Sequence, residues 1–296
     1  MYVLMCFSSM INFHVKRERK LPKQVRNNKY SSRDDELKID CGKCSGLCCV
    51  ALYCAKSDGF PSDKPAGKPC EYLLNDFRCA IHHELKERKM KGCLAYDCFG
   101  AGQKATRSFP QGVNWMTKPS DADEIFAVFR ILFQMHQYLW YLLEAVGLAD
   151  DENTTREIER LIDENERITG LDVRRLVEVD LGGYKSNVDR WLKEVSFKRG
   201  SDRRESKNKN VLGKNFKGAN LEDGDFTMSL MIAANLKGCK LDGANFLGAD
   251  LRDANIKNTD LSKCLFLTQM QINSVIGNKQ TNLPLRLVRP TSWDDQ

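Results

Sequence analysis

Cysteine is the residue whose number and spacing could do chemistry in this chain. The sequence has 12 cysteines, and nine of them lie between Cys41 and Cys98. Such density in a secreted mini-domain indicates disulfides, whereas in a reducing compartment it indicates bound metal. The apolar stretch Met1–Phe13 is too short to span a bilayer, and its positive residues follow it, unlike those of a secretion signal. We therefore expect a cytoplasmic protein whose thiolates bind metal and which has no membrane partner.

The spacing at the start of the cluster favours a metal site. The sequence C-G-K-C from Cys41 to Cys44 places two thiolates within reach of one ion, and Cys48 adds a third about one turn later. Sulfur ligands suit tetrahedral zinc, and they suit iron or an iron–sulfur cluster equally well. Few long apolar runs occur between residues 37 and 112, so metal would have to supply part of the stability there.

This segment resembles a family of zinc- or iron-chelating cysteine-cluster domains, whose pattern is C-x-x-C-x-x-x-C-C followed by further cysteines. The resemblance covers roughly residues 39 to 103. Cys54 stands where an ordinary side chain is expected. His82 is favoured over His83 as a ligand, because its spacing from Cys79 brings the side chains of Cys79 and His82 to one side of a turn. The resemblance implies these ligands: Cys41, Cys44, Cys48, Cys49, Cys70, Cys79, His82, Cys93 and Cys98.

The size of this ligand set raises the question of how many sites there are. Eight cysteines and one histidine are too many for one tetrahedral ion. The ligand set is compatible with two metal sites and also with one cluster that leaves some thiols unbound. The adjacent pair Cys48 and Cys49 favours two sites, because neighbouring thiols rarely bind one ion together.

A glycine-rich stretch follows the last of these cysteines, from Tyr96 to Lys104. It is not a phosphate-binding loop, which needs four residues between its glycines and a Ser or Thr after the lysine. We interpret it as a turn that lets the backbone pass close to the metal. The alternative interpretation makes Asp97 or Gln103 a group that orients a ligand.

The middle of the chain has the pattern of helices. Apolar residues recur at helical spacing from Ser120 to Gly147, and their broad stripe predicts a largely buried helix. Thr154, with Glu157 three residues later, is typical of a capping box that begins a second helix. A third amphipathic stretch runs from residue 173 to 197, which completes a layer of antiparallel helices. His136 lies on the first helix, where a histidine is more often a core residue than a ligand.

From Lys214 onward the sequence reads in units of five residues, and a period of five fits neither a helix nor a flat strand. The first place of each unit after the opening one is small. The pattern resembles the pentapeptide-repeat family, and the resemblance implies a right-handed quadrilateral β-helix with four units to a coil. Like residues recur at a spacing of 20, as in Phe226, Phe246 and Phe266. The third place of every unit is apolar: Phe216, Leu221, Phe226, Met231, Leu236, Leu241, Phe246, Leu251, Ile256, Leu261 and Phe266.

Two cysteines fall within the repeats, and residues after the repeats resemble a cap. Cys239 and Cys264 occupy small inward places, where cysteine behaves as a small buried apolar residue and not as a ligand. Beyond the last unit, a short helix from Thr268 to Ile276 would cover the exposed end of the stack. The remaining tail would then wrap back over it.

Charge argues against nucleic acid as a partner. The net charge of +6 comes largely from the run Lys198–Lys209, which is more typical of a solvated linker than of a nucleic-acid site. Imitation of DNA, by which some pentapeptide proteins shield DNA gyrase, needs a long acidic rod. Here acidic and basic residues balance between Lys214 and Phe266, and the rod is short.

The sequence therefore predicts a multidomain protein that acts as a metal-binding, non-enzymatic scaffold for a protein partner. An iron–sulfur redox or cluster-dependent enzyme is the first alternative, and a DNA gyrase-interacting protein is the second. Two copies of the chain could also pair through the ends of their rods, so a homodimer is a further possibility. The predicted parts are a disordered leader (1–36), a cysteine-rich metal-binding domain (37–112), an α-helical region (113–197), a basic linker (198–210), a pentapeptide-repeat β-helix (211–267) and a C-terminal cap (268–296).

Overall fold

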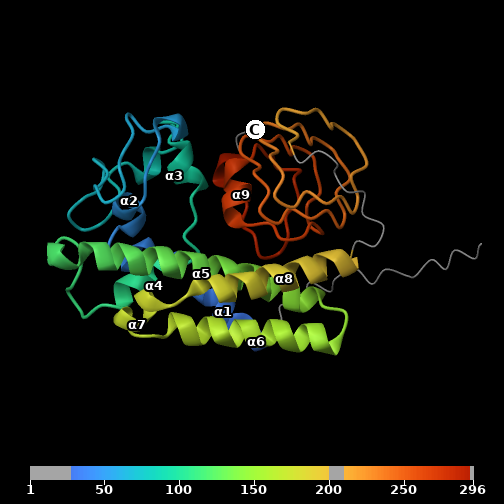
Figure 1. The fold of residues 1–296 in the computed structure, drawn as a ribbon. Coiled ribbons are helices and arrows are strands. Elements are labelled where there is room, and N and C mark those ends of the chain that lie inside the picture. Colours follow the sequence, from blue (N-terminus) through green and yellow to red (C-terminus); the bar gives the residue numbers. More distant parts are fainter. Residues whose placement is uncertain (1–27, 200–209, 294–296) are drawn as a thin grey trace, which may run out of the picture.

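One long helix, α5 (Ala122–Leu148), carries the other parts of the molecule (Figure 1). The computed structural model describes residues 28–199 and 210–293. The cysteine-rich lobe and the stack of coils lie next to each other along α5, and α6 (Glu152–Thr169) lies on the opposite side of that helix (Figure 1). Because α5 is covered from both sides, most of its apolar side chains are buried, from Ile125 to Leu148. Within the described ranges, no helix is both long and apolar enough to cross a membrane.

The second helix begins earlier than its sequence pattern predicts. Asp151 precedes α6, and its side chain accepts a hydrogen bond from the backbone N–H of Thr154 at 2.8 Å. The predicted capping box of Thr154 and Glu157 is therefore wrong, because Thr154 lies inside the first turn and is buried. An aspartate is as good an N-cap as a threonine, and it stands closer to the preceding turn.

The third helical stretch is two helices, α7 (Val173–Glu178) and α8 (Leu181–Arg199), where one was predicted. Asp180 lies between them, and its Oδ1 accepts a hydrogen bond from the backbone N–H of Gly182 at 2.8 Å. Such a local side-chain bond offers the backbone an alternative to continuing the helix. The helix α8 also extends into the first two residues of the predicted linker, whose residues 200–209 lie outside the described ones.

Part of the predicted disordered leader is helical. The turn η1 (Asn28–Tyr30) and the helix α1 (Ser31–Glu36) dock against α6. The Lys29 ammonium and the Tyr30 hydroxyl both donate to Glu159, at 2.6 and 2.9 Å. The prediction of disorder is therefore wrong for residues 28–36, and residues 1–27 lie outside the described part of the chain.

The cysteine-rich lobe consists of short helices joined by turns, with a small apolar interior of its own. The isolated bridges Cys54–Lys64 and Leu73–Cys79 are its only sheet-like pairings in the described residues. Four buried side chains form its separate apolar cluster, namely Phe60, Ile81, Leu85 and Met90. The short helices are η2 (Cys41–Lys43), α2 (Leu47–Ala51), η3 (Lys56–Asp58), η4 (His82–Glu84), α3 (Lys91–Ala95) and α4 (Ala101–Arg107).

The repeats form a stack of coils with 20 residues in each turn. Parallel backbone bridges join residues 20 apart, such as Asn215 with Asn235 and Asn235 with Asn255. The rings of Phe226 and Phe246 stack with centroids 5.3 Å apart, so like residues do lie above like residues. The coils therefore agree with the predicted four-unit turn, although the described residues contain isolated bridges here and no extended strand.

A cap closes the last coil. The helix α9 (Gln269–Ser274) begins with a capping box between Thr268 and Gln271. The Gln271 amide also donates to the carbonyl of Phe246 at 2.9 Å, which satisfies the open edge of the stack. The final turn η6 (Thr291–Trp293) folds back, so that Trp293 is buried. The predicted terminal helix is present, and it ends at Ser274, two residues before the predicted end at Ile276.

One stripe of α5 joins the cysteine-rich lobe to the coils. His136, Trp140 and Glu144 are spaced four residues apart and therefore lie on the same face of the helix. The His136 Nδ1 lies 2.6 Å from the carbonyl oxygen of Phe99 in the lobe. The Trp140 Nε1 donates to the carbonyl of Leu267, and Glu144 accepts from the backbone N–H of Phe266 at 2.7 Å. The two lobes are thus held by successive turns of one helix.

Burial of Glu144 at this junction predicts a dependence of stability on pH. Burial raises the pKa of Glu144 to about 7, against an ordinary value of 4.5. A raised pKa means that the folded chain prefers the protonated acid. The contribution of Glu144 to the unfolding free energy is therefore complete below pH 4.5 and is lost as the pH rises through 7. We expect Glu144→Gln to exceed the parent in unfolding free energy by roughly 1–3 kcal/mol above pH 7, with the gap closing toward pH 5.

Urea unfolding across this pH range measures the difference between variant and parent. The matched control is Glu152→Gln, because the Glu152 side chain is 93% exposed. Its effect on stability should not vary with pH in this window. A Glu144→Gln difference that is equally flat would contradict the assigned burial of the carboxyl group.

Candidate metal centre

Two short helices carry the first thiols, and hydrogen bonds fix the segment that precedes them. Asp40 begins η2, since its Oδ1 accepts a hydrogen bond from the backbone N–H of Gly42 at 3.1 Å. The helix η2 carries Cys41 and leads to Cys44, and α2 then carries Cys48 and the next cysteine. These cysteines are free thiols in the structure.

The glycine-rich stretch fixes the approach to Cys41. Gln103 accepts a hydrogen bond from the backbone N–H of Asp40 at 3.2 Å and donates to the carbonyl of Lys38 at 2.6 Å. Gly100 has a positive φ of 74°, and a Cβ there would stand 2.1 Å from the carbonyl oxygen of Glu36. The stretch is a turn at Phe99 and Gly100 that leads into α4, and its close backbone approach is to Glu36. Gln103 positions the segment that carries the first thiol, and an approach to metal stays a prediction.

Cys41, Cys44, Cys48 and Cys98 form the first thiol group. A Cβ placed on Gly102 of α4 would lie 2.7 Å from the Cys44 sulfur and 3.7 Å from the Cys98 sulfur, so both sulfurs lie against one point of that helix. Burial raises the pKa of Cys98 to about 11, and negative charge on Asp97 and Cys44 adds to the shift. Hydrogen bonding to Cys49 raises the pKa of Cys48 well above its usual value, burial raises it further, and charge on Cys49, Cys44 and Cys98 adds to the shift.

Cys49, Cys54, Cys70, Cys79 and Cys93 form the second thiol group. All but Cys49 pack against the separate apolar cluster of the lobe, whereas Cys44, Cys48 and Cys98 belong to the main core. Burial raises the pKa of Cys93 to about 12, and charge on the other four thiols of its group adds to the shift. Packing therefore separates Cys44, Cys48 and Cys98 from Cys54, Cys70, Cys79 and Cys93. Charge on Cys49 raises the pKa of thiols in both groups, so Cys49 lies between them.

The two groups meet at the adjacent pair. The sulfurs of Cys48 and Cys49 lie 3.8 Å apart. Hydrogen bonding from Cys48 lowers the pKa of Cys49, and the positive charge of Lys64 lowers it further. The positive charge of Lys64 also opposes the rise in the pKa of Cys54 and of Cys70, so this ammonium lies near several thiols of the second group.

Lys64 also holds the loop around the second group. Its ammonium donates to the carbonyl of Leu52 at 2.6 Å and to that of Lys68 at 2.9 Å. The backbone of Lys64 pairs with Cys54, which places the Cys54 thiol within the group. The sequence interpretation left Cys54 out, because its place depends on this loop and not on its spacing from other cysteines.

The structure does not bring together every residue that the resemblance implies. The His82 side chain is exposed on η4, whereas the thiols of the second group are half-buried. In the part of the chain that the structure describes, no three Cys, His, Asp or Glu side chains are arranged closely enough to hold an ion as they stand. The thiols fit a metal by their chemistry and neighbourhood, and binding would require them to draw closer together.

Tyr96 lies beside the first thiol group, and no sequence pattern predicted this position. The hydroxyl of Tyr96 is buried and has no hydrogen-bond partner in the described structure. Its ring stacks on Phe133 of α5, at 6.0 Å between centroids. Burial raises the pKa of Tyr96, and charge on Cys48 and Cys98 raises it further. A phenol in this position can donate to a thiolate sulfur or to a metal-bound group.

The coils and the rest of the chain both have relatives among known proteins. The pentapeptide-repeat family model matches residues 229–266 with eight copies, which makes this a pentapeptide-repeat protein by sequence as well as by the 20-residue coil. Over 265 residues the chain is 38% identical to uncharacterized protein YybG of Bacillus subtilis (strain 168), covering 87% of this chain and 95% of that protein. The chain belongs to the same family as YybG. The matched repeats do not include the cysteine-rich segment, whose resemblance to metal-chelating domains stays a prediction.

The contact between α4 and the first thiol group predicts an unusual effect of alanine. Alanine normally stabilises a helix by about 0.5–1 kcal/mol relative to glycine. In Gly102→Ala the new methyl group would meet the Cys44 sulfur at 2.7 Å. We expect this variant to lose roughly 1–3 kcal/mol of unfolding free energy, the cost of overpacking.

Gly183→Ala is the matched control, because a Cβ at this position of α8 meets nothing within 4 Å. Its urea midpoint should rise or stay unchanged, while that of Gly102→Ala falls. Equal rises in both variants would show that the Cys44 thiol does not pack against α4.

Proposed function

We propose that this is a metal-binding pentapeptide-repeat protein whose cysteine-rich lobe holds two zinc ions and whose coils and helices present a surface to a protein partner. The observation that supports two sites is that Cys44, Cys48 and Cys98 pack in the main core, whereas Cys54, Cys70, Cys79 and Cys93 pack against the separate apolar cluster. Each group contains at least four thiols, the number that a structural zinc ion takes.

Four thiols would bind each ion in this proposal. The first set is the whole first group. The second set is Cys49, Cys70, Cys79 and Cys93, with Cys54 as a neighbouring thiol that makes a weak contact to the carbonyl of Leu52 at 3.9 Å. The exposed His82 is left out, in contrast to the set that the resemblance implies. The adjacent thiols Cys48 and Cys49 then belong to different ions, which avoids the poor geometry of neighbouring ligands.

Energetics also favour a cation in the lobe. Desolvation disfavours each buried thiolate, and neighbouring thiolates repel one another. Around the second group, the separate apolar cluster has only four buried side chains to offset the ordering of the segments that it holds. A divalent ion deprotonates coordinating thiols and links segments far apart in sequence, so that its binding free energy becomes folding free energy.

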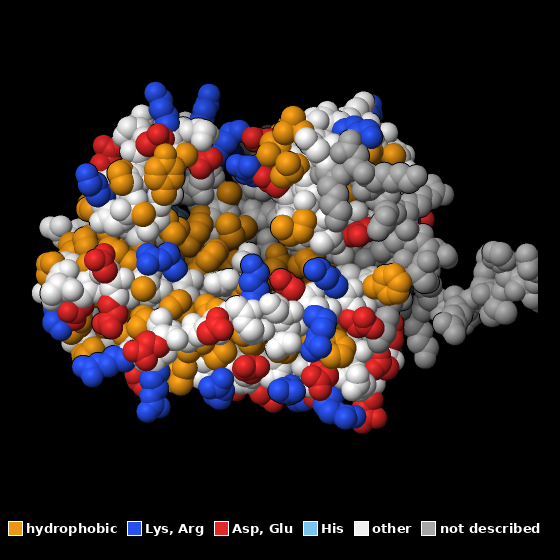
Figure 2. All heavy atoms as spheres, viewed as in Figure 1, with side chains coloured by type: hydrophobic (Ala, Val, Ile, Leu, Met, Phe, Trp, Pro, Cys, Tyr) orange, Lys and Arg blue, Asp and Glu red, His pale blue; other side chains and the backbone are white. Residues whose placement is uncertain are grey.

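The surface of the helical part suits a protein partner better than nucleic acid. On the face drawn in Figure 2, Lys and Arg side chains are interspersed with Asp and Glu side chains over the helices. Nucleic acid is recognised by a continuous basic stripe or patch. Mixed charge of this kind is typical of surfaces that discriminate between protein partners.

Anaerobic purification followed by metal analysis tests the proposal. We expect a colourless protein with about two zinc ions per chain, because zinc has no visible absorption and each group would fill one tetrahedral site. A brown protein that contains iron and labile sulfide would contradict zinc and support the iron–sulfur alternative. Protein that is folded in this lobe and contains no metal after purification in zinc-supplemented buffer would contradict both.

Single substitutions then test the division into two groups. Cys98→Ser and Cys93→Ser should each remove about one of the two ions, because each takes a ligand from a different four-thiol site. Cys239→Ser is the control, because the Cys239 thiol is buried within the coils and donates to the carbonyl of Phe216 at 2.9 Å. It should keep both ions. If one substitution in the lobe abolished all binding, the thiols would form a single cluster.

A further inference from the structure

The charges of the repeats balance along the sequence, but the coils sort them onto different sides. Residues 20 apart are bridged, so units that are 20 residues apart lie above one another on one side of the stack. One such side consists of units 214–218, 234–238 and 254–258, and we call it the lysine side. Its ionisable side chains are all lysines: Lys214, Lys217, Lys237 and Lys257.

Three of these lysines form a column. Lys217, Lys237 and Lys257 take the same place in successive coils, and in each unit an asparagine two residues earlier accepts a hydrogen bond from the lysine backbone N–H, at 3.2, 3.2 and 3.1 Å. The same turn therefore holds each lysine in register with the next. Neighbouring coils pair as strands do, about 4.8 Å apart, so the column spans roughly 10 Å.

The lysine side faces away from the bundle. The side two units further along the chain contacts the helices, since Phe266 donates its backbone N–H to Glu144 of α5 and Asn245 donates to Ser196 of α8. In a four-sided coil these two sides are opposite each other. Of the column, Lys217 is exposed, and the other two lysines are half-buried.

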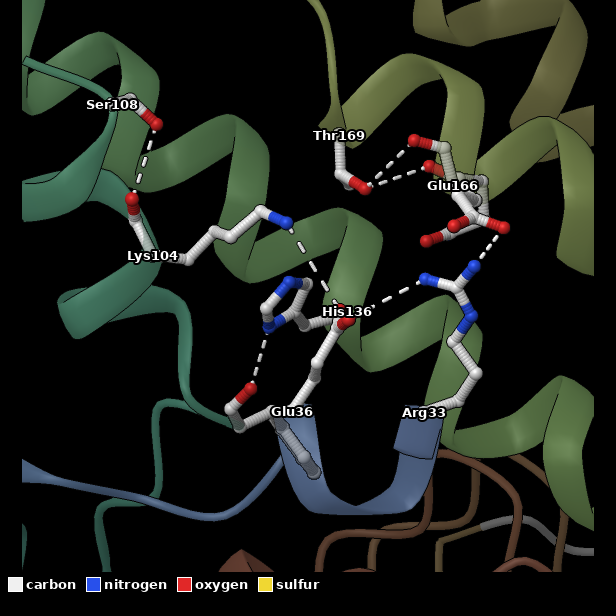
Figure 3. Close-up of polar contacts among 9 residues, drawn as sticks. Arg33, Glu36, Lys104, Ser108, His136, Glu166 and Thr169 are labelled. Carbon is white, nitrogen blue, oxygen red and sulfur yellow. Dashed lines mark hydrogen bonds and ion pairs between the residues drawn. The ribbon is translucent and has the colours of Figure 1, made fainter. Parts of the chain in front are cut away.

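The column has positive charge that the protein does not neutralise. Its three lysines form no ion pair within the described residues. By contrast, Lys263 on the neighbouring side of the coils pairs with Asp242 at 2.5 Å. In the bundle, Arg33 pairs with Glu36 and with Glu166 (Figure 3). Stacked like charges repel one another, so the column weakens the coils unless a partner supplies negative charge.

We propose that the lysine side binds an acidic helix of a protein partner, whose carboxylates lie along one face. Residues i, i+3 and i+7 of an α-helix are separated by about 4.5 and 10.5 Å along its axis, which matches the steps of the column. An extended strand presents side chains on one face only every ~7 Å and matches less well.

Nucleic acid fits this side less well than an acidic helix. A phosphate backbone would extend beyond the narrow column and meet the carboxylates of the neighbouring side, among them Glu222 and Asp242. The inference rests on the proposed role as a scaffold and names the chemistry of the partner. It does not depend on zinc in the cysteine-rich lobe.

Two alanine-based peptides of about 20 residues, long enough to be helical, test the binding. One has glutamates at i, i+3 and i+7, and the other has the same glutamates spread around the helix. We expect the first to bind the full chain roughly threefold or more tightly in fluorescence anisotropy at low ionic strength, with an affinity that falls as salt is added. No binding of the first peptide, or equal binding of both, would overturn the inference. Tighter binding of a DNA duplex through the same lysines would do so in favour of nucleic acid.

Substitution of the column tests its location. Lys217→Gln, Lys237→Gln and Lys257→Gln together should weaken binding of the first peptide about tenfold. The urea midpoint should stay unchanged or rise, because the substitutions remove repulsion between stacked charges. Unchanged affinity in this folded variant would place the peptide elsewhere and overturn the inference.

The matched control removes the same charge from other parts of the surface. Lys68, Lys185 and Lys193 are exposed and lie outside the coils, and their joint replacement by Gln should leave the affinity nearly unchanged. An equal loss in the control would mean attraction to net charge alone and would overturn the inference. Zinc content is measured on the same protein. Protein that holds zinc and fails to bind the peptide would overturn this inference alone, whereas zinc-free protein that binds it would contradict only the metal proposal.

Discussion

Nine thiols share one small lobe, and this is the constraint on which the structure of the lobe depends. Thiols that are buried near one another favour neither ionisation nor an ordered arrangement by themselves. Only four apolar side chains form the separate interior around the second group. The segments that carry Cys49, Cys70 and Cys93 are far apart in sequence, and short turns and the ammonium of Lys64 hold them in place. Under the proposal that zinc binds here, a cation shared by these thiols would supply the cohesion that the apolar cluster lacks.

The remainder of the molecule depends on a different principle. Its interior is one continuous apolar core that runs from the bundle into the coils. A single face of α5 joins the parts through His136, Trp140 and Glu144, which contact the lobe, the cap and the last coil in turn. The guanidinium of Arg286 lies 4.0 Å from the centre of the Trp140 ring and also pairs with Asp34 of α1. Apolar packing and these polar contacts hold the arrangement of the bundle and the coils.

The sequence predicted those features that repeat or that depend on near neighbours. The five-residue period carried the resemblance that implied the length of each coil, and apolar spacing placed α5 within two residues of its observed ends. Features that depend on distant partners escaped prediction. The helix α1 is held by Glu159 and Glu166, more than a hundred residues away, and Cys54 joins its group through the pairing with Lys64. Likewise, the charges of the repeats balance along the sequence, and only the coil gathers Lys217, Lys237 and Lys257 on one side.

Hydrogen exchange with and without exhaustive chelation compares these two halves within one molecule. The measurement follows the protection of backbone amides along the chain, and amide protection reports local stability. The account predicts that amides between residues 41 and 98 lose protection when metal is removed, while those of α5 and of the coils keep theirs. Protection of the cysteine-rich lobe that is the same in both conditions would contradict the central claim that a bound cation holds this lobe together.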